Sequence, residues 1–285
     1  MADVIIIGRG PAGISAALYL RRANLSVLVL GKDGGALARA ERIENYYGLE
    51  RPLTGAELLE NGWRQAAELG AELVEDEVLD LSWDEEFQVF AKNGDYRAKA
   101  VLLATGSARK TAPIRGLTDF EGRGVSYCAI CDAFFYRGKD VAVLGAGEYA
   151  LHEARGLLGI ARSVTLLTDG APLTAEFPPD IAVETARVEE ILGTRAVEGV
   201  RLAGGAQRAL SGVFVALGSA AASDLARRLG AEIDGSRILV DAEMATAVPG
   251  LFAAGDCTGG LQQVATAVAG GAKAAMSLLR FVRGK

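Results

Sequence analysis

Two cysteines separated by two residues are the clearest chemical signal in the sequence. Cys128 and Cys131 form a Cys-x-x-Cys pair, and the chain has only one other cysteine, Cys257. Sulfurs at this spacing can close a reducible disulfide, and the thiolate of such a pair is the attacking group in disulfide exchange. A zinc site would need two more ligands, and only Cys257 and the single histidine, His152, remain, without ligand spacing. The pattern therefore favours a redox pair over a structural disulfide or a metal site.

Two glycine-rich turns accompany the cysteine pair. The sequence GRGPAG at 8–13 follows an apolar run, and GAGEYA at 145–150 follows another and begins fourteen residues after Cys131. Each turn is predicted to lie between a strand and a helix, with a second strand after the helix. Glycines let the backbone approach a pyrophosphate, and the helix N-terminus supplies amide donors. The chain is therefore predicted to contain two Rossmann-like units, the first with a small antiparallel insert around 87–90.

Length and composition fit two domains of a globular protein. The chain has 285 residues, 50% of them hydrophobic, and a net charge of −6. An acidic chain argues against nucleic acid as a partner. The N-terminus lacks the basic segment of a signal peptide. Glycines and charges interrupt the apolar stretch 264–282, which favours a core helix over a membrane span. We expect a cytoplasmic location without membrane association.

Three apolar runs end in similar glycine-containing turns. They close with ATG at 104–106, LGS at 217–219 and AGD at 254–256. Ligands of open α/β sheets bind at the carboxyl ends of the strands. These three turns are therefore predicted to lie beside ligand sites.

The order and spacing of six segments resemble those of the low-molecular-weight thioredoxin reductases over nearly the whole chain. The segments are GRGPAGISAALYLRRANL at 8–25, GGAL at 34–37, ENYYG at 44–48, ATGS at 104–107, CAICDAFFYRGK at 128–139 and AAGD at 253–256. The resemblance implies an α/β fold of two Rossmann-like, three-layer ββα domains, the second inserted in the first and reduced in size. It places an FAD-binding domain at 1–110 and 238–285, and an inserted domain with the Cys-x-x-Cys pair at 111–237.

The resemblance also implies which residues bind FAD. Gly8, Gly10 and Gly13 would contact the pyrophosphate, and Asp33 is the candidate for the adenosine ribose. The remaining candidates lie along the ribityl chain and the flavin ring or close the strands beside them: Gly34, Gly35, Leu37, Asn45, Ala104, Thr105, Gly106, Gly255, Asp256, Gln263 and Val264.

Catalytic roles follow from the same resemblance. Cys128 would be the nucleophile toward the disulfide of the partner, Cys131 the sulfur that faces the flavin, and Asp132 the acid–base group. The residues at positions that contact thioredoxin in this family are Arg123, Phe134 and Phe135. The alternative for the two phenylalanines is a place in the core. Family members are homodimers, so a homodimer is expected here.

The second glycine-rich unit departs from the NADPH-dependent members of the family. Those members have a His-Arg-Arg run after the second strand, where arginines bind the 2′-phosphate. Here the segment 168–172 is TDGAP, and the next arginine is Arg187. The bulk of Tyr149 and the charge of Glu148 also disfavour a phosphate at the turn. The run 169–211 is short for the family and shows no clear strand pattern.

This combination resembles the pyridine-nucleotide-independent, ferredoxin-dependent flavin thioredoxin reductases. We therefore predict that ferredoxin supplies electrons, that FAD and the cysteine pair carry them to thioredoxin, and that NADPH does not bind. Three alternatives stay open. They are an NADH-dependent reductase that uses Asp169, a disulfide reductase with a second flavin or another donor, and a redox-sensing flavoprotein that signals through partner binding.

Overall fold

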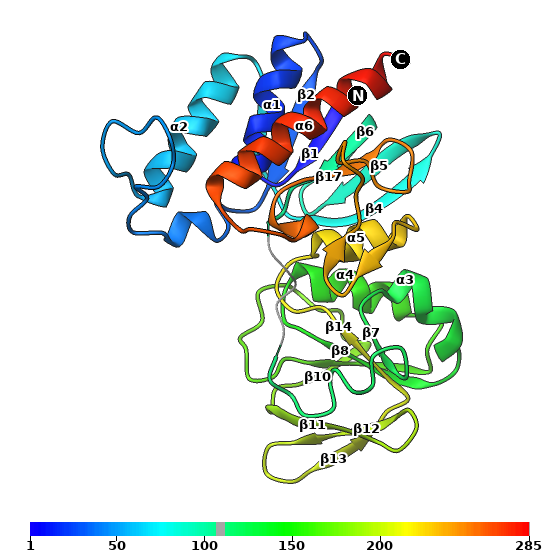
Figure 1. Ribbon diagram of the computed structural model, residues 1–285. Helices are drawn as coiled ribbons and strands as arrows, with labels where there is room; N and C mark the ends of the chain where they lie inside the picture. The colour runs from blue at the N-terminus through cyan, green and yellow to red at the C-terminus, as the bar shows by residue number, and fades with distance from the viewer. Residues whose placement is uncertain (107–111, 285) are drawn as a thin grey trace. The chain divides into compact units, whose positions relative to one another are not determined.

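The protein folds as two compact units. The computed structural model describes residues 1–106 and 112–284. One unit consists of Met1–Ala108 together with Ala221–Lys285, and the other is Arg109–Ala220 (Figure 1). The second unit is therefore inserted into the first along the chain.

The first unit takes its elements from both ends of the chain. In chain order they are β1 (Ala2–Ile7), α1 (Pro11–Arg22), β2 (Val27–Gly31), η1 (Leu37–Arg39), α2 (Gly55–Glu68), β3 (Glu72–Glu75), β4 (Val78–Asp84), β5 (Glu86–Ala91), β6 (Asp95–Leu103), α5 (Ala222–Arg228), β15 (Ile233–Asp234), β16 (Arg237–Ile238), β17 (Leu251–Ala253), η3 (Asp256–Thr258) and α6 (Val264–Val282). Seven strands form one sheet in the order β3-β2-β1-β6-β5-β4, with β17 beside β6. Strands β4, β5 and β6 pair antiparallel, which confirms the insert predicted around 87–90.

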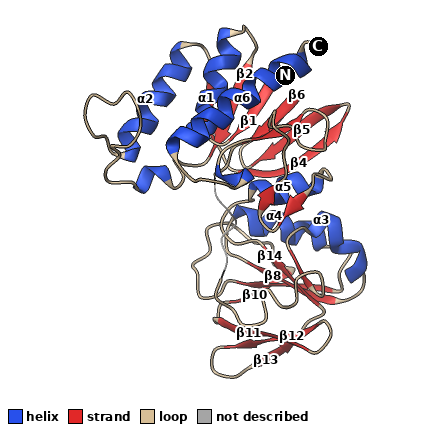
Figure 2. Cartoon of the chain, viewed as in Figure 1, coloured by secondary structure: helices blue, strands red, loops and turns tan. Residues whose placement is uncertain are grey.

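The core of the first unit lies between its parallel strands and two helices (Figure 2). Val4 and Ile6, alternate residues of β1, are fully buried and pack with residues of α1 and α6. Helix α1 begins at Pro11, whose fixed φ suits the first helical position. A Cβ on Gly271 of α6 would lie 2.0 Å from the carbonyl oxygen of Ala12 in α1, so these helices need a glycine to come this close. Within the described part of the chain, no helix has the length and hydropathy that a membrane span requires.

The domain boundaries predicted from the sequence differ from this division at one end. The predicted boundary at 110 lies outside the described residues. The chain returns to the first unit at 221, whereas the prediction was 238. The earlier return arises because α5 packs on β4. Arg228 of α5 forms an ion pair of 2.6 Å with Asp80 of β4, and the two side chains are 2% and 11% exposed.

The second unit repeats the Rossmann-like pattern around a smaller sheet. Its elements are β7 (Val125–Ser126), α3 (Ala129–Asp132), η2 (Ala133–Tyr136), β8 (Asp140–Leu144), α4 (Glu148–Leu157), β9 (Ser163–Leu167), β10 (Ile181–Glu184), β11 (Val188–Gly193), β12 (Val197–Leu202), β13 (Gln207–Ala209) and β14 (Gly212–Val215). Five parallel strands have the order β10-β9-β8-β14-β7, and β11-β12-β13 form a separate antiparallel sheet.

The region 169–211, which shows no clear strand pattern in the sequence, contains four strands. The pairing of β11 with β12 shifts register twice, between Val188 and Glu190 and between Leu192 and Gly193. Gly199 in β12 lies so close to β13 that a Cβ would be 2.6 Å from the carbonyl oxygen of Arg208. Bulges and glycines interrupt the alternation of apolar and polar residues by which strands are predicted.

Candidate redox and nucleotide-binding sites

The first glycine-rich turn is closed against its own sheet on one side and open on the other. The N–H of Gly8 donates to the carbonyl oxygen of Leu30 at 2.7 Å. A Cβ on Gly8 would lie 2.1 Å from the oxygen of Ala104, and one on Gly13 would lie 2.0 Å from the oxygen of Gly8. A Cβ on Gly10, in contrast, would meet no atom of the described residues within 4 Å. The backbone at Gly10 is therefore accessible to a ligand phosphate.

The strand β17 ends beside this turn. A Cβ on Gly255 would lie 3.0 Å from the Cβ of Ala12, at the start of α1. Asp256 follows and is half-buried, and burial raises the pKa of its carboxyl. Its carboxylate makes no side-chain hydrogen bond with any residue that the structure describes. A half-buried acid of this kind is suited to accept a hydrogen bond from a ligand hydroxyl.

Asn45 and Gln263, two of the residues predicted to lie beside the flavin, are hydrogen-bonded although they are far apart in the sequence. The amide nitrogen of Asn45 donates to the side-chain oxygen of Gln263 at 2.9 Å. Gln263 is the N-cap of α6, and Val264 is the first residue of that helix. The ENYYG segment and the start of α6 therefore lie side by side at this hydrogen bond.

The segment after β2 has a tight turn of its own. The carboxylate of Asp33 accepts the N–H of Gly35 at 2.7 Å and is exposed. Gly34 packs closely, because a Cβ there would lie 2.7 Å from Cδ1 of Leu59. Leu37 begins the short helix η1. The acid predicted for the adenosine ribose is thus held by a local backbone bond.

One side chain at the first turn was not singled out from the sequence. Arg9 is 11% exposed and lies over the indole ring of Trp63, with its guanidinium carbon 4.3 Å from the ring centroid. Its Nη1 is 3.1 Å from the carboxylate of Glu75, and Trp63 donates its ring N–H to the carbonyl oxygen of Arg9 at 2.8 Å. These bonds fix the turn to α2 and β3. Nothing in a G-x-G-x-x-G pattern indicates such a role for its second residue.

The residues of the first unit fit FAD. The open backbone at Gly10 leaves room for a pyrophosphate, and Asp256 supplies a free acceptor. The strand end at Ala104, Thr105 and Gly106 completes the same edge of the sheet, with Gly106 in a positive-φ conformation. Ser107 of the ATGS segment lies outside the described residues.

The two predicted redox cysteines form a disulfide with a Cα–Cα distance of 5.3 Å. Cys128 is the N-cap of α3, and its Sγ accepts the N–H of Cys131 at 3.2 Å. Cys128 is 2% exposed, whereas Cys131 is exposed. The two sulfurs are therefore chemically different, because only one of them is accessible and the other accepts an amide hydrogen bond. The third cysteine, Cys257, is fully buried, which raises the pKa of its thiol to about 12.

Asp132 lies beside the pair and is held by a serine. The hydroxyl of Ser126 donates to the carboxylate of Asp132 at 2.6 Å and accepts the N–H of Cys128 at 3.1 Å. The pKa of Tyr136 is raised by burial and then by the charge of Asp132. Ser126, which the sequence analysis did not identify, thus links the predicted acid–base group to the backbone of the buried cysteine.

Helix α4 contributes two buried side chains to this region. Glu153 is 2% exposed, and its Oε2 accepts the N–H of Ala129 at 2.6 Å. Tyr149 is 1% exposed, and its hydroxyl donates to the carbonyl oxygen of Tyr127 at 3.4 Å. Tyr149 therefore points into the unit, so the prediction that its bulk obstructs the second glycine-rich turn is wrong.

Exposed apolar side chains flank Cys131 along the chain. Ile130 and Phe134 are each 70% exposed, and Phe135 is 67% exposed. The two phenylalanines therefore lie at the surface and not in the core. Arg123 lies before β7, hydrogen-bonds to the carbonyl oxygen of Asp119 and covers another ring, that of Phe120.

The second glycine-rich turn has the backbone of the first and a different surface. The N–H of Gly145 donates to the oxygen of Leu167 at 2.9 Å, and a Cβ on Gly145 would lie 2.3 Å from the oxygen of Ala216. A Cβ on Gly147, however, would lie 3.0 Å from Oγ1 of Thr174. The N–H of Thr174 also donates to the carbonyl oxygen of the turn residue between the glycines, at 2.8 Å. A segment of the chain thus lies over this turn.

Asp169, the acid that follows β9, also forms a hydrogen bond within the protein. Asp169 has a φ of 53° and its carboxylate accepts the N–H of Val188, the first residue of β11, at 2.8 Å. The side chain that an NAD site would use for the ribose therefore holds a strand in place.

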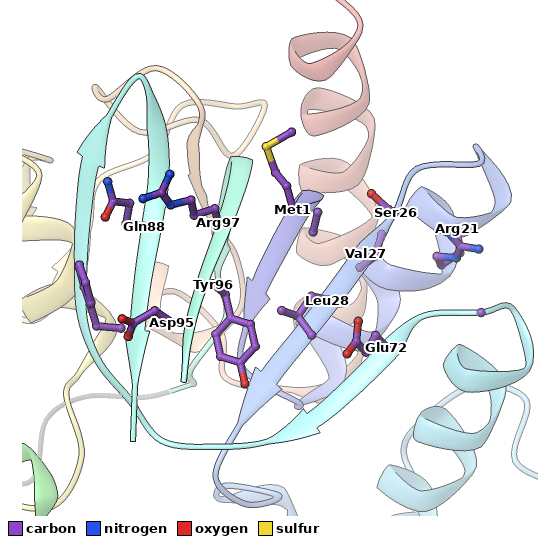
Figure 3. Close-up of a pocket in the computed structure, with 13 residues that line it drawn as sticks. Met1, Arg21, Ser26, Val27, Leu28, Glu72, Gln88, Asp95, Tyr96 and Arg97 are labelled. Carbon is purple, nitrogen blue, oxygen red and sulfur yellow. The ribbon is translucent and has the colours of Figure 1, made fainter. Parts of the chain in front are cut away.

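A cavity of about 530 Å³ lies elsewhere in the first unit. Figure 3 shows its lining side chains, among them Met1, Leu28, Tyr96 and Arg97. These residues lie at or near the amino ends of β1, β2 and β6. Dinucleotides bind at the carboxyl ends of such strands, so this cavity is separate from the glycine-rich turn.

Known proteins resemble this chain over nearly its whole length. A family model described as pyridine nucleotide-disulphide oxidoreductase matches residues 2–271. A thioredoxin reductase from Aquifex aeolicus (strain VF5) is 37% identical over 99% of this chain and 94% of its own length. One from Peptoclostridium acidaminophilum is 36% identical over 98% of this chain and 96% of its own length.

Two solved structures extend this likeness to the fold. The atypical thioredoxin reductase TRi from Desulfovibrio vulgaris Hildenborough has a TM-score of 0.94 and 39% identity, and the match covers 100% of this chain and 99% of that chain. A ferredoxin-flavin thioredoxin reductase from Clostridium acetobutylicum has a TM-score of 0.74 and 32% identity, with coverage of 100% and 99%. The fold predicted from the sequence, two Rossmann-like domains, is confirmed.

Proposed function

The chain belongs to the thioredoxin reductases of the pyridine nucleotide-disulphide oxidoreductase family, and we propose that its electrons come from a ferredoxin rather than from NADPH. Membership implies a flavoprotein with a disulfide-based redox role. The likeness to a ferredoxin-flavin thioredoxin reductase supports the choice of donor. Relatives named only as thioredoxin reductases are 36–37% identical to this chain, against 32% for the ferredoxin-flavin enzyme, so the choice of donor depends on the second glycine-rich turn.

The segment that covers this turn is the observation that carries the proposal. Thr174 donates its N–H to Ala146, and its Oγ1 would be 3.0 Å from a Cβ on Gly147. The pyrophosphate of a dinucleotide approaches the backbone at this second glycine. NADPH would therefore have to displace the protein's own chain before it could bind.

The segment that follows β9 lacks the arginine run by which NADPH would be recognised. Residues 168–172 contain no arginine, and the next one along the chain, Arg187, packs its side chain against Gly170, with its Cγ 3.3 Å from a Cβ built there. The carboxylate of Asp169 already accepts the N–H of Val188, which argues against the NADH-dependent alternative as well. A donor that binds elsewhere, such as a small one-electron carrier protein, avoids both obstacles.

FAD would be held by the first unit, through the backbone at Gly8, Gly10 and Gly13 and the side chain of Asp256. When bound, this cofactor can accept electrons singly and pass them on as a pair, which couples a one-electron donor to a disulfide. Asn45 and Gln263 would support the flavin side, where their mutual hydrogen bond fixes both side chains.

The two cysteines are assigned different roles because they differ in burial and hydrogen bonding. Two electrons break the S–S bond and leave a thiolate and, after proton uptake, a thiol. The accessible Sγ of Cys131 would receive the electrons, and Cys128 would be released as the thiolate that the Cys131 N–H stabilises. Asp132, held by Ser126, is placed to supply the proton.

Thioredoxin would then be reduced by exchange. The thiolate of Cys128 attacks one sulfur of the thioredoxin disulfide, and the other thioredoxin sulfur leaves as a thiolate. Cys131 attacks Cys128 in the mixed disulfide, which restores the pair and frees the second thioredoxin sulfur. Because Cys128 is 2% exposed, its sulfur must first be uncovered. Phe134 and Phe135 offer exposed rings to which thioredoxin could dock.

A coupled assay with three electron sources tests this proposal. The purified flavoprotein is mixed with oxidised thioredoxin and with reduced ferredoxin, NADPH or NADH. We expect many turnovers with ferredoxin and none with either nicotinamide, and Cys131→Ser should abolish thioredoxin reduction while flavin stays bound. Rapid turnover with NADPH and none with ferredoxin would overturn the proposal. Reduction that stops at one equivalent would favour a redox sensor.

A homodimer, with no membrane partner and a cytoplasmic location, remains part of the proposal. Mass measurement of the purified protein in solution checks the dimer directly, and a monomer at micromolar concentration would contradict it.

A further inference from the structure

We propose that Glu153 is a positioning residue for the cysteine pair and makes it a stronger reductant, an inference that depends on the redox role proposed above. Glu153 belongs to α4, which packs against the short helix α3 that carries the pair. In the sequence Glu153 is only one of two acids in its helix, so its role can be recognised only from its contacts.

The carboxylate of Glu153 holds the first turn of α3. Its side chain is 2% exposed, and its Oε2 lies 2.6 Å from the backbone nitrogen of Ala129. Ala129 directly follows Cys128 and begins the helix. Two backbone amides of α3 thus have acceptors at its start, because the N–H of Ala129 donates to Glu153 and that of Cys131 donates to Cys128 Sγ.

This arrangement determines in which direction Glu153 changes the reduction potential of the cysteine pair. The disulfide is uncharged, whereas its reduction creates a thiolate on Cys128. A buried carboxylate that accepts the N–H of the next residue, Ala129, disfavours that negative charge, because charges interact strongly where water is excluded. Destabilising the reduced form makes the pair give up its electrons more readily. Glu153 therefore orients α3 through a hydrogen bond and tunes the pair through its charge.

Other charged or titratable groups lie on the same elements. Beyond Glu153, they are Asp132 on α3, Glu148, Tyr149, His152 and Arg155 on α4, and Tyr136 on η2. Glu148 provides a matched control. It is a carboxylate on the same helix and is half-exposed, and Glu148→Gln changes the net charge by the same amount as Glu153→Gln.

Three variants of the flavin-loaded protein test the inference. Glu153→Gln keeps an oxygen that can accept the Ala129 N–H and removes the charge, Glu153→Ala removes both, and Glu148→Gln is the control. The disulfide is equilibrated with glutathione, and the alkylation rate of Cys128 in the reduced protein is followed against pH by mass spectrometry.

We expect Glu153→Gln to shift the equilibrium with glutathione about tenfold toward the dithiol, which corresponds to about 30 mV. Its alkylation profile should move to lower pH, and Glu148→Gln should stay within twofold of the wild type. Glu153→Ala should shift the same way and also lower the thermal unfolding midpoint, because α3 loses its anchor.

An unchanged equilibrium in Glu153→Gln would overturn the inference, and so would an equal shift in Glu148→Gln. These measurements involve neither ferredoxin nor NADPH. A failed donor prediction would therefore leave them valid, whereas a pair that does not exchange with glutathione at all would contradict the proposed function itself.

Discussion

The two glycine-rich turns of this protein have the same backbone and different surroundings. In each turn the first glycine donates its N–H to the end of the neighbouring strand, at 2.7 Å in Gly8 and 2.9 Å in Gly145. In each, a Cβ on that glycine would collide with the carbonyl oxygen that follows the strand on the other side. These are the oxygens of Ala104 after β6, at 2.1 Å, and of Ala216 after β14, at 2.3 Å. Both turns therefore satisfy the packing requirements of a dinucleotide-binding unit.

They differ at the second glycine, where a ligand would approach. Gly10 is open, and Gly147 is covered by Thr174. The acids after the second strands are alike, because Asp33 accepts the N–H of Gly35 and Asp169 that of Val188, whereas Asp256, after β17 in the first unit, has no side-chain partner among the described residues. The comparison shows that a glycine pattern specifies how strand, turn and helix pack, and that the surrounding segments decide whether a nucleotide can bind.

The largest expected effect tests the shared scaffold. Gly8→Ala and Gly145→Ala should each destabilise the protein by about 3 kcal/mol or more, because both combine a Cβ clash with a positive φ, 125° and 159°. Thermal unfolding measures the loss. Gly204 is the control, since its φ is 88° and a Cβ there meets nothing within 4 Å, so Gly204→Ala should cost only about 1 kcal/mol. If Gly145→Ala proved as mild as the control, the two turns would not share a scaffold.

The next largest effect should separate the two turns. Gly10→Ala and Gly147→Ala both have ordinary φ values, −81° and −120°, so neither strains the backbone. Gly10→Ala should weaken FAD binding at least tenfold, since its Cβ points to the open side of the turn. Gly147→Ala should leave flavin content unchanged and shift only the exposed Thr174. Flavin absorbance after dialysis reports both, and equal flavin loss in the two variants would contradict the comparison.

The two acids should respond in opposite ways to removal. Asp169→Ala should cost about 1–2 kcal/mol of stability, because it loses the bond to Val188 and leaves alanine at a positive φ. Its flavin content should not change. Asp256→Ala should lose flavin, and without flavin it should be at least as stable as the wild type, since no hydrogen bond to the described residues is broken. Urea unfolding and flavin titration on both variants check the pair, and a stability loss confined to Asp256→Ala would reverse the assignment.

A smaller effect concerns pH. Burial raises the pKa of Asp256, so the folded protein binds this proton more tightly than the unfolded chain. The ionised carboxylate therefore opposes folding at neutral pH, and this cost disappears as the pH falls through the raised pKa. Asp256→Asn should unfold at a slightly higher temperature than the wild type at pH 7, when flavin is absent from both. The gap should close toward pH 4, and a gap that widened there would contradict the sign.

Much of this architecture could be predicted from the sequence. The apolar runs before the two turns, such as 4–7 and 141–144, are buried parallel strands in the structure. The Cys-x-x-Cys spacing sufficed to predict a disulfide between Cys128 and Cys131. These features depend on local pattern and spacing, which the sequence displays directly.

Features that depend on long-range contacts could not be predicted in this way. The return to the first unit at 221 depends on the ion pair of Arg228 with Asp80. The inward direction of Tyr149 depends on the rotation of α4 against its neighbours. The cover that Thr174 forms over the second turn depends on the path of a loop with no regular pattern.

Calorimetric titration of NADPH into the flavin-loaded protein tests the central claim most directly. We predict no saturable heat up to millimolar NADPH and no loss of flavin absorbance, because Thr174 covers the second turn and the segment 168–172 has no arginine for the 2′-phosphate. A dissociation constant in the micromolar range, with NADPH bleaching the flavin, would contradict the account.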